Sequence, residues 1–374
     1  MQRRGISSGG MMAAIVSVLS LTTAARGDDI KASFSAYGTF GGTFTSNGDY
    51  QYYHTSTEFK GASNDFDAAL ESRIGAQAQI DVGSDVSIIV QELAEQRGST
   101  PFSLGTEWAF IQYTPIPDVK LRLGRVALSA FLFTDTRNVG YAQPWFRAPN
   151  EIYYSEPYTN LDGGQGMWHV SAGPVGLDLE GEYGISSLSV DVGGVPAQLN
   201  AKYMWNVSAA ATYQSFLVRI AETKVVTEVS LPLSPTDTLS VLNSDSFLSL
   251  GAQYDDGRAL VLAEWSKRTE PTFPQLGVPI AEAKQWYVAA GWHYMKFTPM
   301  LIYGKYNSAP SLVTPPGNMG TLSASFRYDV LANVALKFQI SRPEVTNSNY
   351  FIDPNYASSQ RVNVYSLGAD FVLY

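Results

Sequence analysis

The sequence lacks cysteine and is poor in histidine and in charged residues. Its 374 residues include no Cys and 3 His, and Asp, Glu, Lys and Arg make up 16% of the chain, against about 25% in average soluble domains. Without cysteine there is no disulfide, thiolate nucleophile, Cys-based metal site or lipidated N-terminal Cys. Aromatic residues are plentiful by contrast, with 22 Tyr, 18 Phe and 7 Trp. This balance favours a protein that meets lipid.

Residues 1–27 have the organisation of a secretory signal peptide. Arg3 and Arg4 form a charged start, an apolar run covers Met11 to Ala25, and small residues flank a cleavage site before Asp28. The run is too short and too rich in Ser and Thr to span a bilayer. The arginine pair also fits a twin-arginine signal, but the ordinary secretory interpretation is favoured.

Removal of this segment leaves an acidic protein. It takes three of the 25 basic residues and none of the 34 acidic ones. Nucleic-acid binding needs clustered Lys and Arg to contact phosphates, and no such cluster is present. We therefore exclude nucleic acid as a partner. No composition break divides residues 28–374, so we expect one domain.

Apolar and polar residues alternate along most of this domain. Between Ala68 and Ile80, for example, the even positions are mainly apolar, whereas the odd ones include Glu, Arg and Gln. Successive side chains of a β-strand point to opposite faces, so such a segment has one apolar and one polar face. The same pattern bounded by turn residues predicts 16 strands, at 32–46, 66–81, 85–96, 105–114, 118–125, 165–173, 175–184, 202–214, 215–225, 246–255, 258–268, 284–297, 299–307, 319–330, 333–342 and 361–373.

The connections between these segments alternate in length. Tight turns follow the even-numbered segments, as at Val82-Gly83-Ser84, and longer links follow the odd-numbered ones, as at 47–65, 126–164, 185–201, 226–245 and 343–360. Short turns at one end and long loops at the other are typical of bacterial outer-membrane barrels. The fold class predicted is all-β, a transmembrane antiparallel up-and-down β-barrel of about 16 strands. A barrel of this size encloses an aqueous lumen.

Aromatic residues at strand ends indicate which face meets lipid. The apolar face of 284–297 begins with Trp286 and ends with Trp292 and Tyr294. Amphipathic rings sit at headgroup depth, so rings at both ends fit the two interfacial girdles of a membrane barrel. The apolar face is therefore expected to point outward and the polar face into the lumen.

Two segments resemble the Gram-negative outer-membrane porin family. The fifth strand ends in the Gly124-Arg125 step, and the stretch Arg137 to Tyr153 is similar to a Trp-x-Arg-Pro-Pro type loop, with Ala148 in place of the first proline. The last strand alternates up to the terminal aromatic Tyr374, although that ring has the opposite parity from Phe371. The resemblance implies a third long loop, 126–164, that folds inward and narrows the channel. It also implies a homotrimer in contact with outer-membrane lipid and lipopolysaccharide.

An inward loop brings a set of charged residues to the narrowest point of the pore. Opposed acids and bases across a pore sort solutes by charge. The loop contributes five of the candidates and the predicted strands three more: Asp135, Arg137, Arg147, Glu151, Asp162, Arg73, Lys120 and Arg122. Pairing among themselves to hold the loop is the alternative role for each. Four acids of the loop, Asp135, Glu151, Glu156 and Asp162, motivate the hypothesis of a mild cation preference.

The predicted function is a porin for passive diffusion of small hydrophilic solutes across the bacterial outer membrane, without catalysis, cofactor or metal. A structural or adhesive barrel is the alternative. A barrel-embedded hydrolase is disfavoured, although His169 and Ser171 share one face of a strand, because residues two apart on a strand are separated by about 7 Å. A TonB-gated transporter is also disfavoured, because strands begin near Ala32 and leave no room for a plug domain.

Overall fold

The computed structural model describes residues 30–48, 51–53, 61–97, 100–153, 157–192, 195–234, 237–270, 281–309, 317–346 and 360–374. The predicted signal peptide, 1–27, lies outside the described residues. Among the described residues, no helix is long and apolar enough to cross a membrane.

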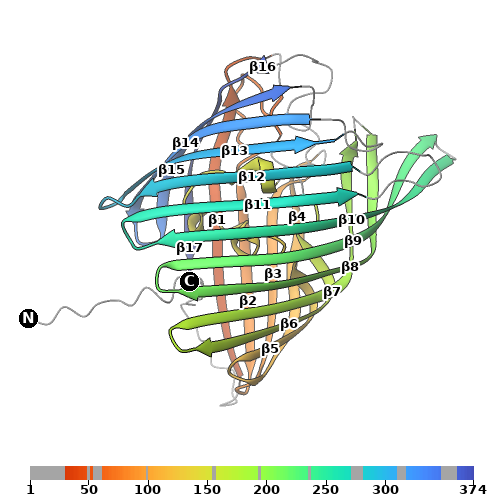
Figure 1. Ribbon diagram of the computed structural model, residues 1–374, viewed down its shortest axis with the longest axis vertical. Coiled ribbons are helices and arrows are strands. Elements are labelled where there is room, and N and C mark those ends of the chain that lie inside the picture. Colours follow the sequence, from red (N-terminus) through yellow and green to blue (C-terminus); the bar gives the residue numbers. More distant parts are fainter. Residues whose placement is uncertain are drawn as a thin grey trace, which may run out of the picture.

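One antiparallel sheet contains all the described strands (Figure 1). The strands are β1 (Ile30–Thr45), β2 (Arg73–Val82), β3 (Val86–Arg97), β4 (Thr100–Ile116), β5 (Val119–Ala127), β6 (Asn160–Ala172), β7 (Val175–Val192), β8 (Val195–Tyr213), β9 (Phe216–Ser234), β10 (Asp237–Asp255), β11 (Ala259–Glu270), β12 (Ala281–Trp292), β13 (Phe297–Ser308), β14 (Gly317–Leu331), β15 (Val334–Thr346), β16 (Gln360–Arg361) and β17 (Val364–Leu373). The short β16 pairs only with the end of β15.

The sheet closes on itself, which confirms the predicted barrel of 16 strands. Apart from the short β16, each strand pairs with the strands before and after it in the chain, and β15 pairs with β17. These 16 strands close the barrel because β1 pairs with both β2 and β17. Gly38 of β1, for example, lies opposite Ile74 on one side and Phe371 on the other. Both described ends of the chain, Ile30 and Tyr374, lie near the tight turns, because Ile30 pairs with Val82 and Leu373 pairs with Ala36.

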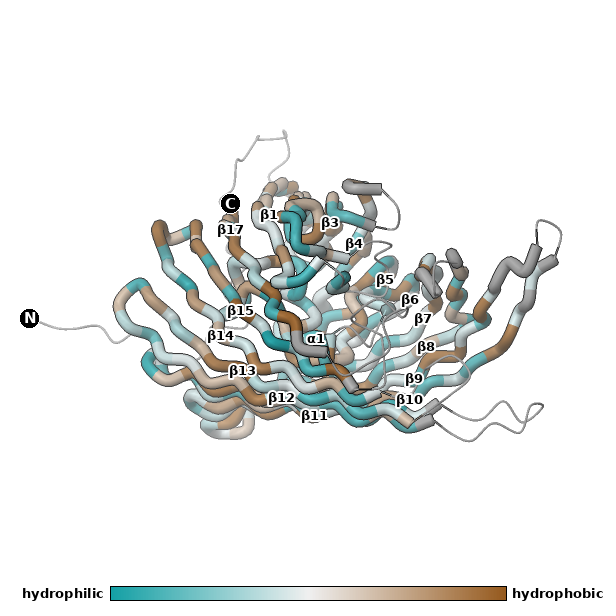
Figure 2. The backbone as a smooth tube through the Cα atoms, turned by 90° about the horizontal axis from the view of Figure 1, so that it is seen from above, coloured by the Kyte–Doolittle hydropathy of each residue, from teal (hydrophilic) through white to brown (hydrophobic). Residues whose placement is uncertain are grey.

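The two faces of the strands differ as the alternation predicts. Along β13, exposed and buried residues alternate, with Leu301 and Tyr303 facing outward. Figure 2 shows the same alternation of apolar and polar residues along the walls of the barrel. Exposed rings gather at the tight-turn ends of the strands, at Trp168, Tyr213, Phe216 and Trp292, and again further along them, at Tyr183, Tyr203 and Tyr303. Two such rows fit the interfacial girdles of a membrane barrel.

Several strands are longer than the sequence pattern predicted. The expected loops 185–201 and 226–245 are wrong, because β7 and β8 are separated only by residues 193–194, and β9 and β10 only by residues 235–236. In Figure 1 the pair β9–β10 reaches far beyond the neighbouring strands. The extensions were missed because their two faces are not clearly apolar and polar. Conversely, the strand predicted at 66–81 begins only at Arg73.

The connection between β5 and β6 is the functionally interesting part of the fold. It runs from Leu128 to Thr159 and carries two short 3₁₀ helices, η1 (Thr134–Thr136) and η2 (Gly140–Ala142), and one helical turn, α1 (Asn150–Tyr153). Figure 2 shows α1 within the concave side of the sheet. Residues 154–156 of this connection lie outside the described part of the chain.

Candidate functional site

The first part of the connection lies against the inward-facing side of β7, β10 and β11. The backbone N–H of Ser129 donates to both carboxylate oxygens of Glu182 at 3.3 and 3.1 Å. Ser249 donates its hydroxyl to the carbonyl of Ala130 at 2.6 Å, and the N–H of Leu132 donates to Glu264 at 2.9 Å. These strand side chains satisfy backbone groups that would otherwise be buried without partners.

The middle of the connection lies against β14, β15 and β17. The ammonium of Lys337 donates to the carbonyls of Gly140 and Gln143 at 2.6 and 2.7 Å, and pairs with Asp370 at 2.7 Å. Arg327 donates to the carbonyls of Tyr141 and Gln143 at 2.7 and 3.0 Å. Two cations, Lys337 and Arg327, therefore hold the η2 turn against the part of the wall formed by β14, β15 and β17.

The third part of the connection forms an apolar core inside the barrel. Trp145 is fully buried and meets the rings of Phe133 and Tyr287 edge-on, with centroids 5.2 and 5.7 Å apart. The core joins loop residues to inward-facing residues of the strands; these include Leu128, Phe131, Ile152, Tyr153, Ile89, Phe110, Met204, Leu262, Met300 and Ile302. The inner wall is thus partly apolar, which differs from the uniformly polar face expected, because the connection needs apolar surface to pack against.

Arg147 is a buried anchor of the connection and does not line an open pore. Its guanidinium forms an ion pair with Glu71, donates to Thr43 and Ser366 at 2.7 and 2.8 Å, and lies 4.8 Å from the ring centroid of Tyr52. The predicted pore-lining role is therefore wrong. The side chain instead takes the alternative role, holding the loop against the barrel wall.

Glu151 is also buried, so the prediction that it lines the pore is corrected as well. Its carboxylate lies where a Cβ on Gly304 would stand, so the glycine makes room for it. Burial raises the pKa of Glu151 from its ordinary value of 4.5 to about 7, against the opposing effect of a hydrogen bond with Thr321. This residue is on the connection and not on a membrane-spanning strand.

Five other predicted residues remain on the interior side of the barrel, four of them on β5 and the connection. The guanidinium of Arg122 donates to Gln112 and Gln165 at 2.9 Å each and stacks on Phe110 at 4.8 Å. Lys120, two residues earlier on the same face of β5, is exposed. Asp135 of η1 is exposed as well, and it acts electrostatically on Arg122. Arg137 is half-buried on the connection.

Arg73 starts β2 on the inward face and is half-buried. It lies opposite Thr39 on one side and Glu95 on the other, and it acts electrostatically on Lys337. Arg73 and Lys337 therefore place positive charge on the wall next to the η2 turn. Arg122 and Asp135 influence each other elsewhere in the interior, so the predicted residues do not form one ring.

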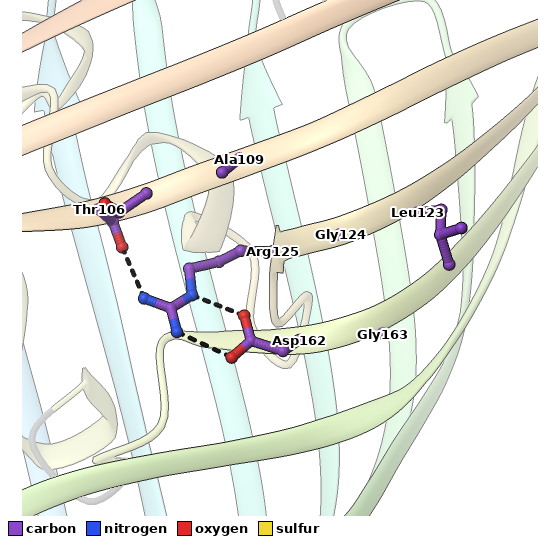
Figure 3. Close-up of a pocket in the computed structure, with 7 residues that line it drawn as sticks. All are labelled: Thr106, Ala109, Leu123, Gly124, Arg125, Asp162 and Gly163. Atoms are coloured by element: carbon purple, nitrogen blue, oxygen red, sulfur yellow. Dashed lines mark hydrogen bonds and ion pairs between the residues drawn. The ribbon is translucent and has the colours of Figure 1, made fainter.

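Asp162 lies on the outer surface of the barrel, which corrects the prediction that it lines the constriction. It belongs to β6 on the same face as Trp168, and forms a bidentate ion pair with Arg125 at 2.7 and 2.8 Å (Figure 3). Arg125 also donates to the carbonyl of Thr106 at 3.2 Å. Asp162 faces outward because β6 already begins at Asn160, before the predicted start at residue 165. Asp162 is therefore part of the strand, an even number of residues from the outward-facing Trp168.

The ion pair forms part of the lining of a shallow pocket of about 460 Å³ on the outer surface of the barrel. The pocket is lined by Thr106, Ala109, Leu123, Gly124, Arg125, Asp162 and Gly163 (Figure 3). Gly124 has φ of +134°, a conformation that favours glycine. Leu123 is 71% exposed on one side, and Leu104 is 72% exposed on the other. Exposed apolar residues therefore lie on both sides of the charges along the strands.

Sequence reasoning did not select the residues of the barrel wall that hold the connection. Glu71, Glu264 and Lys337 are all buried, and each contacts the connection. Their inward parity was visible in the alternation, but parity alone does not separate a residue that faces water from one that a loop covers. Among the described residues, no group of three or more His, Cys, Asp or Glu comes together as a metal site would require.

No protein-family model and no curated protein sequence matches this chain. Solved structures do. An anion-selective porin from Comamonas acidovorans is 10% identical, with a TM-score of 0.58 over 92% of this chain and 100% of that chain. The outer membrane channel DcaP of Acinetobacter baumannii is 14% identical, with a TM-score of 0.56 over 91% and 97%. A trimer form of the outer membrane protein OmpT of Vibrio cholerae is 12% identical, with a TM-score of 0.55 over 92% and 100%.

Likeness at such low identity is a likeness of fold. It agrees with the closed sheet, the exposed apolar outer face and the rows of rings described above. The chain has the closed 16-stranded fold of the Gram-negative outer-membrane porins.

Proposed function

We propose that this protein is a porin of the bacterial outer membrane, exported by a signal peptide at 1–27, that lets small hydrophilic solutes and ions diffuse passively. The observation that carries the proposal is the connection 128–159, which crosses the interior of a wide barrel and is anchored on several walls. A connection placed in this way leaves a narrow path in place of an open lumen. Solved structures of the same fold include an anion-selective porin and the outer membrane channel DcaP, which supports this proposal.

The path is lined on one side by exposed residues of the connection and on the other by β5. Asp135 supplies negative charge from the connection, whereas Lys120 and Arg122 supply positive charge from the wall. Arg147 and Glu151 act as anchors, and Asp162 has no part in the lining. Charges of both signs across a narrow path would favour dipolar solutes over ions of either sign.

The hypothesis of a mild cation preference loses most of its support. It rested on four acids of the connection, of which Glu151 is buried, Asp162 faces outward, and Glu156 lies outside the described residues. Asp135 remains. We therefore expect weak selectivity, with a shift toward anions in Asp135→Asn, measured as reversal potentials under a salt gradient. An unshifted potential would remove Asp135 from the lining.

Single-channel conductance in planar bilayers tests the main proposal. The wild-type protein should give steady ohmic steps, and a variant in which residues 135–143 are replaced by a short Gly/Ser linker should give larger ones. Equal steps in both would show that the connection does not limit the current. Absence of steps in folded wild-type protein would favour the structural or adhesive barrel.

We further propose that the protein forms a homotrimer in lipid that includes lipopolysaccharide. Ala36 of β1 is a small residue on the outward face, and it permits close contact between barrels. The outward ion pair of Arg125 and Asp162 is a second support, because a neighbouring subunit that covers these charges would shield them from lipid. Glu92 adds a further acid, which accepts a hydrogen bond from Thr106 at 2.6 Å.

A further inference from the structure

A serine, a histidine and an aspartate lie together at the tight-turn end of β6 and β7. His169 Nδ1 is 2.7 Å from Asp178 Oδ1, and His169 Nε2 is 3.4 Å from Ser171 Oγ. The sequence argument that Ser171 lies beyond reach of His169 is wrong, because the imidazole leans along the strand toward the hydroxyl. The two ring nitrogens are used in the order that a hydrolytic triad requires.

All three side chains face the lumen and are open to water. They share the inward face with Gln165 of β6 and with Glu180 and Glu182 of β7. His169 is 44% exposed and Asp178 is 58% exposed. Asp178 orients the imidazole through its 2.7 Å contact with Nδ1. The backbone N–H of His169 donates to the carbonyl of Asp118 at 2.8 Å, which fixes this part of β6 next to the turn.

Ser171 is exposed, and the residue that pairs with it across the hairpin carries no side chain to cover it. Its partner across the hairpin is Gly176, where a Cβ would stand 3.3 Å from His169 Cε1. The pairing of β5 with β6 ends at Val119 and Trp168. Because His169 directs its N–H toward β5, the N–H of Ser171 points to the same side, beyond the first residue of β5. That N–H is placed to donate to an oxyanion formed at Ser171.

We infer that Ser171, His169 and Asp178 form a hydrolytic site for small water-soluble carboxylic esters that enter the lumen. Ser171 Oγ attacks the ester carbonyl carbon while His169 Nε2 takes the hydroxyl proton, and Asp178 stabilises the imidazolium. The C–O bond to the alcohol breaks, and the alcohol leaves with that proton. Water then attacks the acyl-serine with His169 again as the base, which releases the carboxylic acid and restores Ser171.

A second lumenal histidine at the same end of the barrel provides an internal comparison. His293 contacts Thr298 Oγ1 through Nδ1 at 3.0 Å, and its Nε2 is 3.6 Å from Asp255. Compared with His169, the two ring nitrogens of His293 have exchanged partners: Nδ1 contacts the hydroxyl and Nε2 lies near the carboxylate. Thr298 is also buried, whereas Ser171 is exposed. His293 is therefore a matched control that keeps a His, a hydroxyl and an acid without the order needed for attack.

The experiment uses the purified full-length barrel in detergent, with a fluorophosphonate probe and p-nitrophenyl acetate. We expect the probe to modify Ser171, identified by mass spectrometry of the peptide that contains it. Ser171→Ala should abolish labelling and reduce ester hydrolysis to the background rate. His169→Ala and Asp178→Asn should each slow hydrolysis by about 100-fold or more. Ser187→Ala, at an exposed serine of β7, and His293→Ala should leave both signals unchanged.

Heat-dependent gel mobility checks that every variant is folded. No adduct at Ser171 in the folded wild-type protein would overturn the inference, as would hydrolysis that survives Ser171→Ala at the wild-type rate. An equal loss in His293→Ala would also overturn it, because the activity would then be a general property of exposed histidines. The conductance measurements above test the porin independently of these outcomes.

Discussion

At the scale of single residues, the connection 128–159 is held by buried charges. Arg147 and Glu71 form an ion pair that is almost fully buried, and Thr43 and Ser366 complete the polar surroundings. Breaking a buried pair from one side leaves the other charge without compensation, which costs more than the net value of the pair. The anchors are therefore the positions where single substitutions should have the largest effects.

Replacing Arg147 by Met should destabilise the protein by about 3–5 kcal/mol, because Glu71 then stays buried and unpaired. The double variant Arg147→Met/Glu71→Leu should lose less than the sum of the two single changes. Urea unfolding in lipid, followed by Trp emission, measures each free energy of unfolding. Arg258→Met, at an exposed arginine near a tight turn, is the control and should change it by less than about 0.5 kcal/mol. Additive effects would contradict the pairing.

Glu151 should make stability depend on pH. Its pKa of about 7 in the folded protein lies above the ordinary value of 4.5, so the folded state keeps a proton that the unfolded chain loses. The free energy of unfolding should therefore fall as pH rises from about 4.5 to 7 and then level off, by about 3 kcal/mol in all. Thermal unfolding midpoints at a series of pH values measure this dependence.

Glu151→Gln should flatten that pH dependence, because the amide resembles the protonated acid and does not ionise. The midpoints of wild type and variant should be similar near pH 4.5 and separate toward pH 8. Asp135→Asn changes an exposed acid of the same connection and should keep the wild-type slope. If Glu151→Gln retained the full slope, another group would be responsible.

At the scale of elements, the η2 turn fits closely against β1 and β17. Gly140 has no side chain, and a Cβ there would collide with Asp370 Oδ1 and Thr39 Oγ1. The same turn accepts the hydrogen bonds of Lys337 and Arg327 through its carbonyls. A small displacement of this turn should therefore loosen the whole middle of the connection.

Gly140→Ala should destabilise the protein by about 1–3 kcal/mol through overpacking, and should add fluctuations to the open-channel current. Urea unfolding and current noise in planar bilayers are the measurements. Gly181→Ala is the control, since a Cβ there would meet nothing within 4 Å. Equal behaviour of the two variants would show that the turn tolerates the extra methyl group.

The alternation in the sequence was enough to predict the strands that have one apolar and one polar face. In β14 and β15, for example, Leu322 and Phe338 face outward as expected, and the predicted spans nearly match the observed ones. Asp162 could have been placed too, because counting back by twos from Trp168 along β6 puts it on the outer face. The burial of Arg147 and Glu151 could not, since their partners Glu71 and Gly304 are distant in the chain and only the folded barrel brings them together.

At the scale of the whole molecule, the outer surface is not uniform. On β4, exposed apolar residues lie on both sides of Thr106: Phe102 and Leu104 on one side, Ile111 and Tyr113 on the other. Between them, β3 to β6 present Glu92, Thr106, Arg125 and Asp162. A second copy of the chain could satisfy these groups better than hydrocarbon does.

Arg125→Leu/Asp162→Leu should weaken association without unfolding the barrel, because both charges are removed together. The oligomer should dissociate at a lower temperature on unheated gels, while the heat-modifiable mobility of the monomer persists. Leu301→Ala, on the outer face of β13, is the control and should leave dissociation unchanged. A wild-type protein that migrates as a monomer, or a double variant as stable as wild type, would contradict the proposed trimer contact.

The pairing of β1 with β17 has a consequence for biogenesis. The first strand finds its second partner only in the last residues of the chain, where Ala36 meets Leu373 and Gly38 meets Phe371. Until those residues have been exported, both lateral edges of the sheet expose unpaired N–H and C=O groups, which readily pair with other chains. A chain truncated before Val364 should therefore aggregate or be degraded in the periplasm, and the assembly of this protein cannot finish before its translation and secretion do.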